Sequence, residues 1–319
     1  MMSKKWMWKL ILLLVLLALL VLTIKFLRPS GNSTPTASRG TLDRYPQFAS
    51  QHIKSRDVLV WLPEGYQPGE PCDVLYMHDG QMLFDATTTW NRQEWQVDEI
   101  LSRLIDEDRI RRCIVVGIYN TDDRLFEYFP TKTWQQVSEA DRKNVKLEKL
   151  TADAYLQFIV EELKPFIDEH YQPLTTREHT FMMGSCMGGL ISLYALCEYP
   201  QVFGGVACLS SHLSMAHLPG GIDGEAWATG FRNYVGLHLP TANGSLIYMD
   251  HGTEDLDADY GAYQQPLDSF ITALGWNDTH YMSRVYDGHG HNETCWAKRL
   301  DQPLVFLLSK QPQPHLATN

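Results

Sequence analysis

The chain has 319 residues, of which 44% are hydrophobic and 20% charged, an ordinary balance for a globular protein. This length suffices for one large domain or two small ones. The net charge of −11 and the lack of any cluster of Lys and Arg beyond the N-terminus argue against nucleic-acid binding, which needs clustered basic side chains.

An uncharged apolar run, LILLLVLLALLVLTI, covers residues 10–24. As a helix it rises only about 22 Å, short of a hydrocarbon core of about 30 Å, but Trp6 and Trp8 can lie in one interface and flanking basic residues can reach water. A cleaved signal peptide has a similar layout, yet the bulky segment TIKFLRP stands where a small-residue cleavage site is needed. We therefore expect residues 1–28 to be a signal anchor that forms a transmembrane helix, with cleavage and secretion as the alternative. The rest of the chain then lies across the membrane, in a periplasmic or extracellular space.

Residues 29–44 follow as a predicted linker, because Ser, Thr, Pro and Gly dominate their first part. Residues 310–319 are predicted to be a disordered tail. Between them, residues 45–309 contain seven apolar runs without alternation, typical of central parallel strands covered on both faces. These predicted strands are residues 57–63, 72–80, 111–120, 179–185, 204–210, 244–252 and 280–288.

Helical patterns separate most of these strands, at residues 94–107, 151–171, 187–199, 260–275 and 294–309. Thr151 is a candidate N-cap of the second, and Pro266 and Pro303 are expected to mark first turns or kinks. Alternating strands and helices predict an α/β fold with a doubly wound, mostly parallel sheet. Two long connections, 120–150 and 211–243, are either substrate-contacting loops or mobile surface.

The fourth strand runs into the sequence GSCMG, residues 184–188, and then into a helix. A strand, a G-x-S-x-G turn and a helix form a nucleophile elbow, in which glycines two positions before and after the nucleophile relieve crowding. Gly184 and Gly188 place Cys186 at the centre, whereas centring Ser185 would put methionines at the glycine positions. A thiol can act there, because a helix N-terminus and a histidine partner lower its pKa. The alternatives are an impaired hydrolase and a cysteine without a chemical role.

The remaining groups of a triad should follow as an acid and then a histidine. The strand end MDHGTEDLDADY offers Glu254, Asp255 and Asp257, and we favour Asp255 because it stands three residues after a glycine. Its carboxylate could instead belong to an acidic helix N-terminus. The loop after the last strand offers His289 and His291; as an H-x-H pair they could bind metal, but no third ligand is evident, so we predict none.

An oxyanion hole needs two backbone N–H groups. One is expected from Met187, directly after the nucleophile, and the other from Gly80 or Gln81 in the turn after the second strand. His78 and Asp79 are interpreted as part of a structural turn. The other cysteines lack metal-ligand spacing and mostly lie in apolar runs, which favours buried free thiols over disulfides. They are Cys72, Cys113, Cys197, Cys208 and Cys295.

Five segments together resemble the putative esterase family of α/β-hydrolases, which includes the enterochelin esterases and esterase D. They are VLYMHDGQMLFD, GIYNTDDRLFEYFP, YLQFIVEELKPFIDEHY, MGSCMGGL and GHGHNETCW, in order over about residues 45–309. The resemblance implies an α/β-hydrolase fold and hydrolysis of a small-molecule ester or thioester through an acyl-enzyme. The family carries serine where this chain has Cys186, which puts ordinary serine-esterase activity in doubt.

The family's last motif, a glycine, a histidine three residues later and an acid two residues beyond, matches Gly288, His291 and Glu293, and so implies His291 as the base. Esterase D has a strand end similar to MDHGTED, which supports Asp255. The enterochelin esterases have an R-x-x-E segment like Arg124 to Glu127, so Arg124 could contact an anionic substrate group or simply pair with Glu127. No cofactor is implied. The leading alternative to an enzyme is a pseudo-hydrolase that binds a ligand or partner without turnover.

Overall fold

The computed structural model describes residues 34–142, 150–215, 223–242 and 244–310. The chain divides into two compact units, Met1–Thr34 and Pro35–Asn319, and every element below belongs to the second. The predicted anchor at 1–28 and all but the first residue of the predicted tail fall outside the described residues. Within those residues, no helix has the length and apolar character needed to cross a bilayer.

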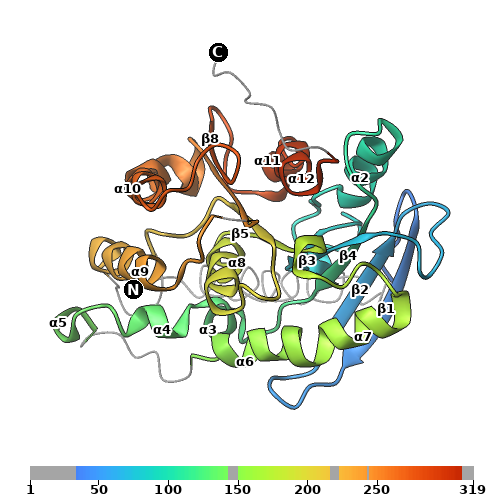
Figure 1. Ribbon diagram of the computed structural model, residues 1–319, viewed down its shortest axis with the longest axis horizontal. Helices are drawn as coiled ribbons and strands as arrows, with labels where there is room; N and C mark the ends of the chain where they lie inside the picture. Colours follow the sequence, from blue (N-terminus) through green and yellow to red (C-terminus); the bar gives the residue numbers. More distant parts are fainter. Residues whose placement is uncertain (1–33, 143–149, 216–222, 243, 311–319) are drawn as a thin grey trace, which may run out of the picture. The chain divides into compact units, whose positions relative to one another are not determined.

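One eight-stranded sheet organises the second unit, with strand order β1-β2-β4-β3-β5-β6-β7-β8 (Figure 1). Strands β1 and β2, and β2 and β4, are antiparallel, and every other neighbouring pair is parallel. The strands are β1 (Thr41–Phe48), β2 (Arg56–Leu62), β3 (Asp73–His78), β4 (Cys113–Ile118), β5 (Thr180–Ser185), β6 (Gly205–Leu209), β7 (Leu246–Gly252) and β8 (Tyr281–Tyr286). The seven predicted strands are confirmed; β1 was not predicted and begins inside the predicted linker.

Helices cover both faces of the sheet (Figure 1). They are η1 (Gly80–Met82), α2 (Val97–Asp106), α3 (Arg124–Tyr128), α4 (Thr131–Trp134), α5 (Glu139–Arg142), α6 (Ala152–Gln157), η2 (Phe158–Leu163), α7 (Lys164–Tyr171), η3 (Arg177–His179), α8 (Met187–Glu198), α9 (Gly224–His238), η4 (Asp255–Asp259), α10 (Tyr260–Ala273), α11 (Glu293–Ala297) and α12 (Asp301–Leu308).

Strand β3 shows how two cores arise from one apolar run. Val74 and Tyr76 join the core under α6 to α10, whereas Leu75 and Met77 join the core under α2 and α12. Because successive side chains of a strand point to opposite faces, a strand buried on both faces needs apolar residues at every position. The mostly parallel, doubly wound α/β sheet predicted from the sequence is thereby confirmed.

Several helix predictions need correction. The predicted helix 151–171 contains a π-helical segment, η2, between α6 and α7, and Thr151 occupies the N-cap position without a capping bond from its side chain. The predicted helix 294–309 is split into α11 and α12; Pro303 lies in the first turn of α12, but Pro266 lies inside α10. The connection predicted at 211–243 contains the fifteen-residue helix α9.

Candidate active site

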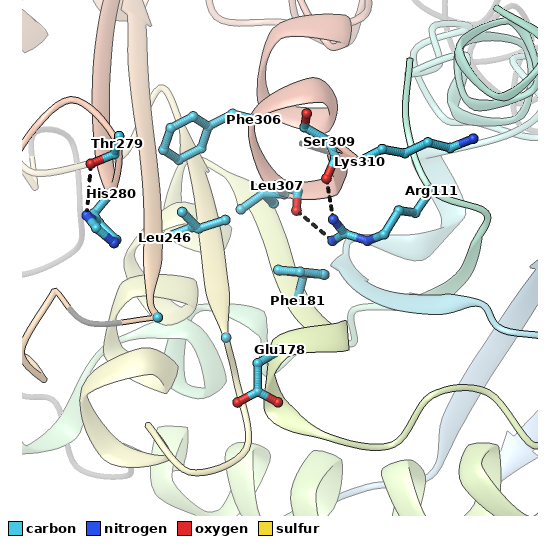
Figure 2. Close-up of a pocket in the computed structure, with 12 residues that line it drawn as sticks. Arg111, Glu178, Phe181, Leu246, Thr279, His280, Phe306, Leu307, Ser309 and Lys310 are labelled. Carbon is cyan, nitrogen blue, oxygen red and sulfur yellow. Dashed lines mark hydrogen bonds between the residues drawn. The ribbon is translucent and has the colours of Figure 1, made fainter. Parts of the chain in front are cut away.

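The amino ends of the parallel strands border a cavity of about 580 Å³ (Figure 2). Apolar side chains such as Phe181 and Leu307 form part of its lining. Its basic groups already have partners, because Arg111 pairs with Asp73 at 2.7 Å and Lys310 pairs with Asp108. None of the residues predicted for catalysis lines this cavity, so the candidate site lies at the carboxyl ends of the strands, where ligands bind in open α/β sheets.

Cys186 stands at the carboxyl end of β5, between the strand and the first residue of α8. Its backbone has φ 58° and ψ −122°, a strained conformation for a residue with a side chain. A Cβ atom added to Gly184 would lie 2.9 Å from backbone atoms of Gly188, so glycine is needed there. The local structure is therefore a nucleophile elbow centred on Cys186, and Ser185 is the last residue of the strand, as the spacing predicts.

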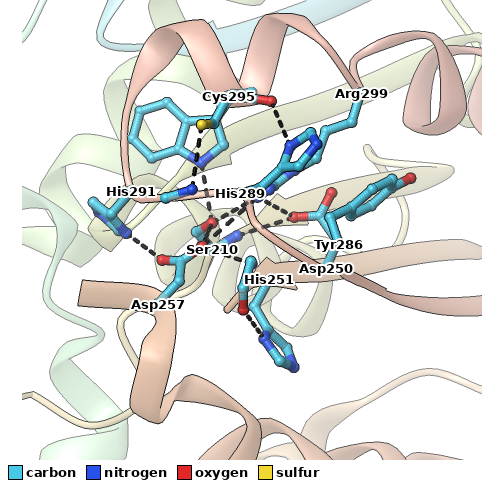
Figure 3. Close-up of polar contacts among 12 residues, drawn as sticks. Ser210, Asp250, His251, Asp257, Tyr286, His289, His291, Cys295 and Arg299 are labelled. Carbon is cyan, nitrogen blue, oxygen red and sulfur yellow. Dashed lines mark hydrogen bonds and ion pairs between the residues drawn. The ribbon is translucent and has the colours of Figure 1, made fainter. Parts of the chain in front are cut away.

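His291 lies in the loop between β8 and α11, and its Nδ1 is 2.6 Å from Oδ1 of Asp257. His289 is directed elsewhere: its Nδ1 lies 3.3 Å from the carbonyl oxygen of Cys295, and its own carbonyl accepts hydrogen bonds from the N–H groups of Thr253 and Glu254. The structure therefore brings His291, and not His289, to the carboxylate (Figure 3).

The preference for Asp255 as the partner of His291 is wrong. Asp255 is exposed, has a left-handed backbone with φ 55°, and begins the 3-10 helix η4. Its carboxylate reaches toward Gly290, where an added Cβ would lie 2.1 Å from Oδ2. Asp257, two residues later on the same turn, is fully buried and carries its carboxylate to the histidine.

The Asp257 carboxylate is held by a buried polar cluster that the sequence analysis missed (Figure 3). Its Oδ2 accepts hydrogen bonds from Ser210 Oγ at 2.5 Å and from the Gly252 N–H at 2.7 Å. Ser210 Oγ in turn accepts bonds from Trp296 Nε1 and from Arg299 Nη2. These hydrogen bonds fix the orientation of the Asp257 carboxylate.

Arg299 pairs with Asp250 at 2.9 Å inside the same cluster, and both side chains are fully buried. It lies in the break between α11 and α12. In the sequence Arg299 stands in a predicted amphipathic helix, where a basic residue is normally exposed, so no pattern marked it.

Electrostatics at this site favour a thiolate–imidazolium pair. Burial raises the pKa of the Cys186 thiol, but the hydrogen bond to His291 and the positive charges of His291 and Arg124 outweigh it and lower that pKa. Burial lowers the pKa of His291, yet its hydrogen bonds with Asp257 and Cys186 raise it to about 9. Burial also raises the pKa of Asp257, but bonds from His291 and Ser210 keep it below its ordinary value.

A cavity of about 560 Å³ opens onto these groups. It is lined by Asp79, Gln81, Met82, Trp90, Asn91, Gln93, Trp95, Asn120, Arg124, Ser185, Cys186, His291, Asn292, Glu293 and Trp296. Its lining comes from loops after β3, β4, β5 and β8, which meet at one edge because those strands are parallel. The volume is that of a small-molecule site.

Arg124 lines this cavity, and the alternative that it pairs with Glu127 is wrong. Its guanidinium binds Asp79 through two bonds, of 2.7 and 2.8 Å, while Glu127 forms a buried ion pair with Arg56. Asp79, interpreted as part of a structural turn, therefore also orients a guanidinium in the cavity wall. His78, interpreted as part of the same turn, is the last residue of β3; it is buried and bonded to Tyr155.

The two residues offered for the second oxyanion donor differ in position. Gln81 lines the cavity, whereas Gly80 packs so tightly on β4 that an added Cβ would lie 2.4 Å from the carbonyl carbon of Gly117. Gly80 therefore allows the close approach of η1 to the sheet, and Gln81 is the better donor candidate. Met187 begins α8 directly after the thiol, at the expected place for the first donor.

All six cysteines are free thiols, as expected for the five outside the elbow. Four of those five are buried, and Cys295 is half-buried.

Comparison with known proteins places this geometry in context. The family model described as "Putative esterase" matches residues 50–307. Among curated proteins, the Bacillus subtilis protein YjcH is 27% identical over 176 residues, covering 54% of this chain and 63% of that protein. The siderophore enterobactin esterase of Emericella nidulans is 28% identical over 152 residues, covering 46% of this chain and 48% of that enzyme.

A solved structure, the enterobactin esterase from Shigella flexneri, superposes with a TM-score of 0.60 at 19% identity. The match covers 86% of this chain and 60% of that one, so this chain spans about three fifths of its length. At 19% identity this superposition shows a shared fold and nothing about activity.

Proposed function

The chain belongs to the Putative esterase family, and from that premise we propose that it hydrolyses carboxylic esters or thioesters through an acyl-enzyme on Cys186. The observation that carries the proposal is the elbow geometry of Cys186 together with the His291–Asp257 contact of 2.6 Å. A nucleophile, a base and a carboxylate that orients the base are the parts of a hydrolytic triad.

In the proposed acylation step, the Cys186 thiolate attacks the substrate carbonyl and forms a tetrahedral oxyanion. The N–H groups of Met187 and Gln81 are the candidate donors to that oxygen. The intermediate collapses with cleavage of the bond to the leaving group, which takes the proton from Nε2 of His291. Asp257 holds Nδ1, so Nε2 is the ring nitrogen available for this transfer.

In deacylation, neutral His291 takes a proton from water as the water attacks the thioester carbonyl, and the Cys186 sulfur then departs as a thiolate. The thiolate–imidazolium pair is restored without any external oxidant or reductant. Because a thiolate leaves more readily than an alkoxide, the first tetrahedral intermediate of an alkyl ester tends to revert. We therefore propose that thioesters and activated esters are the better substrates.

The apolar run at residues 10–24 supports a second part of the proposal, that the hydrolase is anchored in a membrane with its catalytic unit on the periplasmic or extracellular side. Secretion after signal cleavage is the alternative. The run lies outside the described residues, so this part rests on the sequence.

The test is intact-mass spectrometry of the full chain in detergent, after brief exposure to p-nitrophenyl acetate or an acetyl thioester, beside Cys186→Ser. A transient acyl adduct on Cys186 with turnover is the expected result. A stable adduct without turnover, relieved in the serine variant, would indicate a stalled esterase. No adduct, and no activity with serine, would overturn the proposal in favour of a binding protein.

A further inference from the structure

Glu293, the first residue of α11, contributes a carboxylate to the wall of the active-site cavity. Its Oε2 accepts a hydrogen bond of 2.7 Å from Asn91 Nδ2. Among the residues that the structure describes, this carboxylate has a neutral partner and forms no ion pair. The side chain is half-buried, so water only partly screens its charge.

The other charged groups that line the cavity cancel in pairs. Arg124 neutralises Asp79 through its two bonds of 2.7 and 2.8 Å. The net charge of Cys186 and His291 together is zero, whether the shared proton lies on the sulfur or on the imidazole. The carboxylate of Glu293 is therefore the uncompensated charge of the cavity lining.

Trp90 lines the same cavity and is 82% exposed, an unusual state for a tryptophan. It precedes Asn91, whose side chain donates to Glu293, and Trp90 and Glu293 both line this cavity. The next residue, Arg92, bonds the carbonyl of Thr87 and does not line the cavity. An exposed indole and a carboxylate in the lining of one cavity are chemical groups that attract organic cations.

The position of Glu293 indicates which part of a substrate would meet it. The leaving group takes a proton from His291, so it lies beside that ring. Glu293 follows His291 by two residues, in the same connection between β8 and α11. The leaving group is therefore the part of the substrate proposed to meet this carboxylate.

We infer that the substrate is a thioester or activated ester whose leaving group carries a cationic centre, such as a substituted ammonium, held between the Trp90 indole and the Glu293 carboxylate. This inference rests on the proposed hydrolytic function and adds the substrate class. The net charge of −11 would also favour the approach of a cation.

The kinetic test compares acetylthiocholine with S-(3,3-dimethylbutyl) thioacetate, in which carbon replaces the charged nitrogen at the same shape. Hydrolysis is followed by loss of thioester ultraviolet absorbance, because thiol reagents would modify Cys186. We expect kcat/KM of the full chain to favour the cation by about five- to thirtyfold. Glu293→Gln, which keeps an oxygen for Asn91, should lower this ratio severalfold.

Two further variants sharpen the kinetic test. Trp90→Ala should also lower the ratio, and Trp90→Phe should retain part of it. Glu169→Gln removes the same charge from the exposed face of α7, outside the cavity, and should leave the ratio as it is. A wild-type ratio near one, or a ratio unaffected by Glu293→Gln, would overturn the inference.

A binding test separates this inference from the proposed function. In Cys186→Ala, which cannot form an acyl-enzyme, choline and 3,3-dimethylbutanol are titrated by calorimetry, with and without Glu293→Gln. Preference for choline that depends on Glu293 supports the cation site even if neither thioester is hydrolysed. Hydrolysis of the neutral thioester without any preference for choline would sustain the hydrolase and overturn the cation site.

Discussion

Cys186 holds its conformation of φ 58° and ψ −122° because its backbone is fixed on both sides. Its N–H donates to the carbonyl of Leu209, and its own carbonyl accepts from the N–H groups of Gly189 and His212. This geometry places the thiol at the start of α8, where the positive end of the helix dipole and the imidazolium of His291 both favour a thiolate.

The thiolate–imidazolium pair predicts a pH profile that differs between cysteine and serine. His291 has a pKa raised to about 9, so its proton is present below that pH and is lost as pH rises through it. With phenyl acetate, kcat/KM of the native chain should rise as the thiol ionises and fall above about pH 9. In Cys186→Ser the neutral imidazole must act as base, so kcat/KM should only rise. A native profile without an alkaline fall would rule out the imidazolium as the acid.

Asp257 should matter far more than its neighbour Asp255. Asp257→Asn removes the charge that favours the imidazolium, and we expect kcat/KM to fall by about three orders of magnitude. Asp255→Asn, at an exposed position where asparagine tolerates the positive φ, should change it less than about twofold. Circular dichroism of both variants checks the fold. Equal losses in the two variants would contradict the assignment.

These two aspartates mark how far the sequence could identify the site. Cys186 follows from glycine spacing, and His291 from its loop and a family motif. The choice between Asp255 and Asp257 depends on the backbone conformation at the start of η4, where Asp255 has a φ of 55° and Asp257 contacts His291. The spacing of residues in the sequence does not reveal this conformation. Ser210 donates a hydrogen bond to Asp257, and Arg299 donates one to Ser210. The sequence did not reveal these contacts, because the residues are far apart along the chain.

Strand β5, helix α8 and the short helix η1 position the Cys186 thiol and both candidate oxyanion donors, and their positions depend on close backbone approach. Central strands were predictable because burial on both faces leaves long apolar runs. Edge strand β1 was missed because none of its residues is buried, so it lacks such a run. Helix α9 was missed because it contains glycines, which have low helix propensity. At Gly230 an added Cβ would lie 2.8 Å from Val137, so close packing requires glycine there.

Gly80→Ala tests whether η1 positions an oxyanion donor. The new Cβ would lie 2.4 Å from the Gly117 backbone, so η1 and Gln81 must shift away from the sheet. We expect a fall of at least about tenfold in kcat/KM and a loss of about 1–3 kcal/mol in the free energy of unfolding. Alkylation of Cys186 by iodoacetamide should lose much less of its rate, because His291, which favours the thiolate most, lies outside η1.

The matched control is Gly261→Ala in α10, where the nearest atom to an added Cβ is 3.3 Å away. It should affect kcat/KM little. If Gly80→Ala were as active as this control, the second oxyanion donor would have to lie elsewhere than in η1.

At the scale of the whole molecule, the cavity, Cys186, His291 and Asp257 lie at one edge of the parallel part of the sheet. The loops after β3, β5, β7 and β8 all begin at this edge, and residues as far apart in the sequence as Asp79 and His291 therefore lie close together. The alternation of strands and helices predicted the parallel sheet to which this edge belongs. It could not predict which side chains face one another across it, because that depends on loop conformations.

The proposed membrane anchor predicts how the entire chain fractionates. The full chain should sediment with membranes and resist extraction by alkaline carbonate, because an uncharged apolar run at 10–24 is costly to expose to water. Placing arginines at Leu16 and Leu17 should release it, since each charge at the centre of a span costs about 2.5–3.5 kcal/mol. The mass of the sedimented chain distinguishes an uncleaved anchor from a processed form. A full-length chain found in the supernatant would contradict the anchor, whereas a shortened one there would support secretion after cleavage.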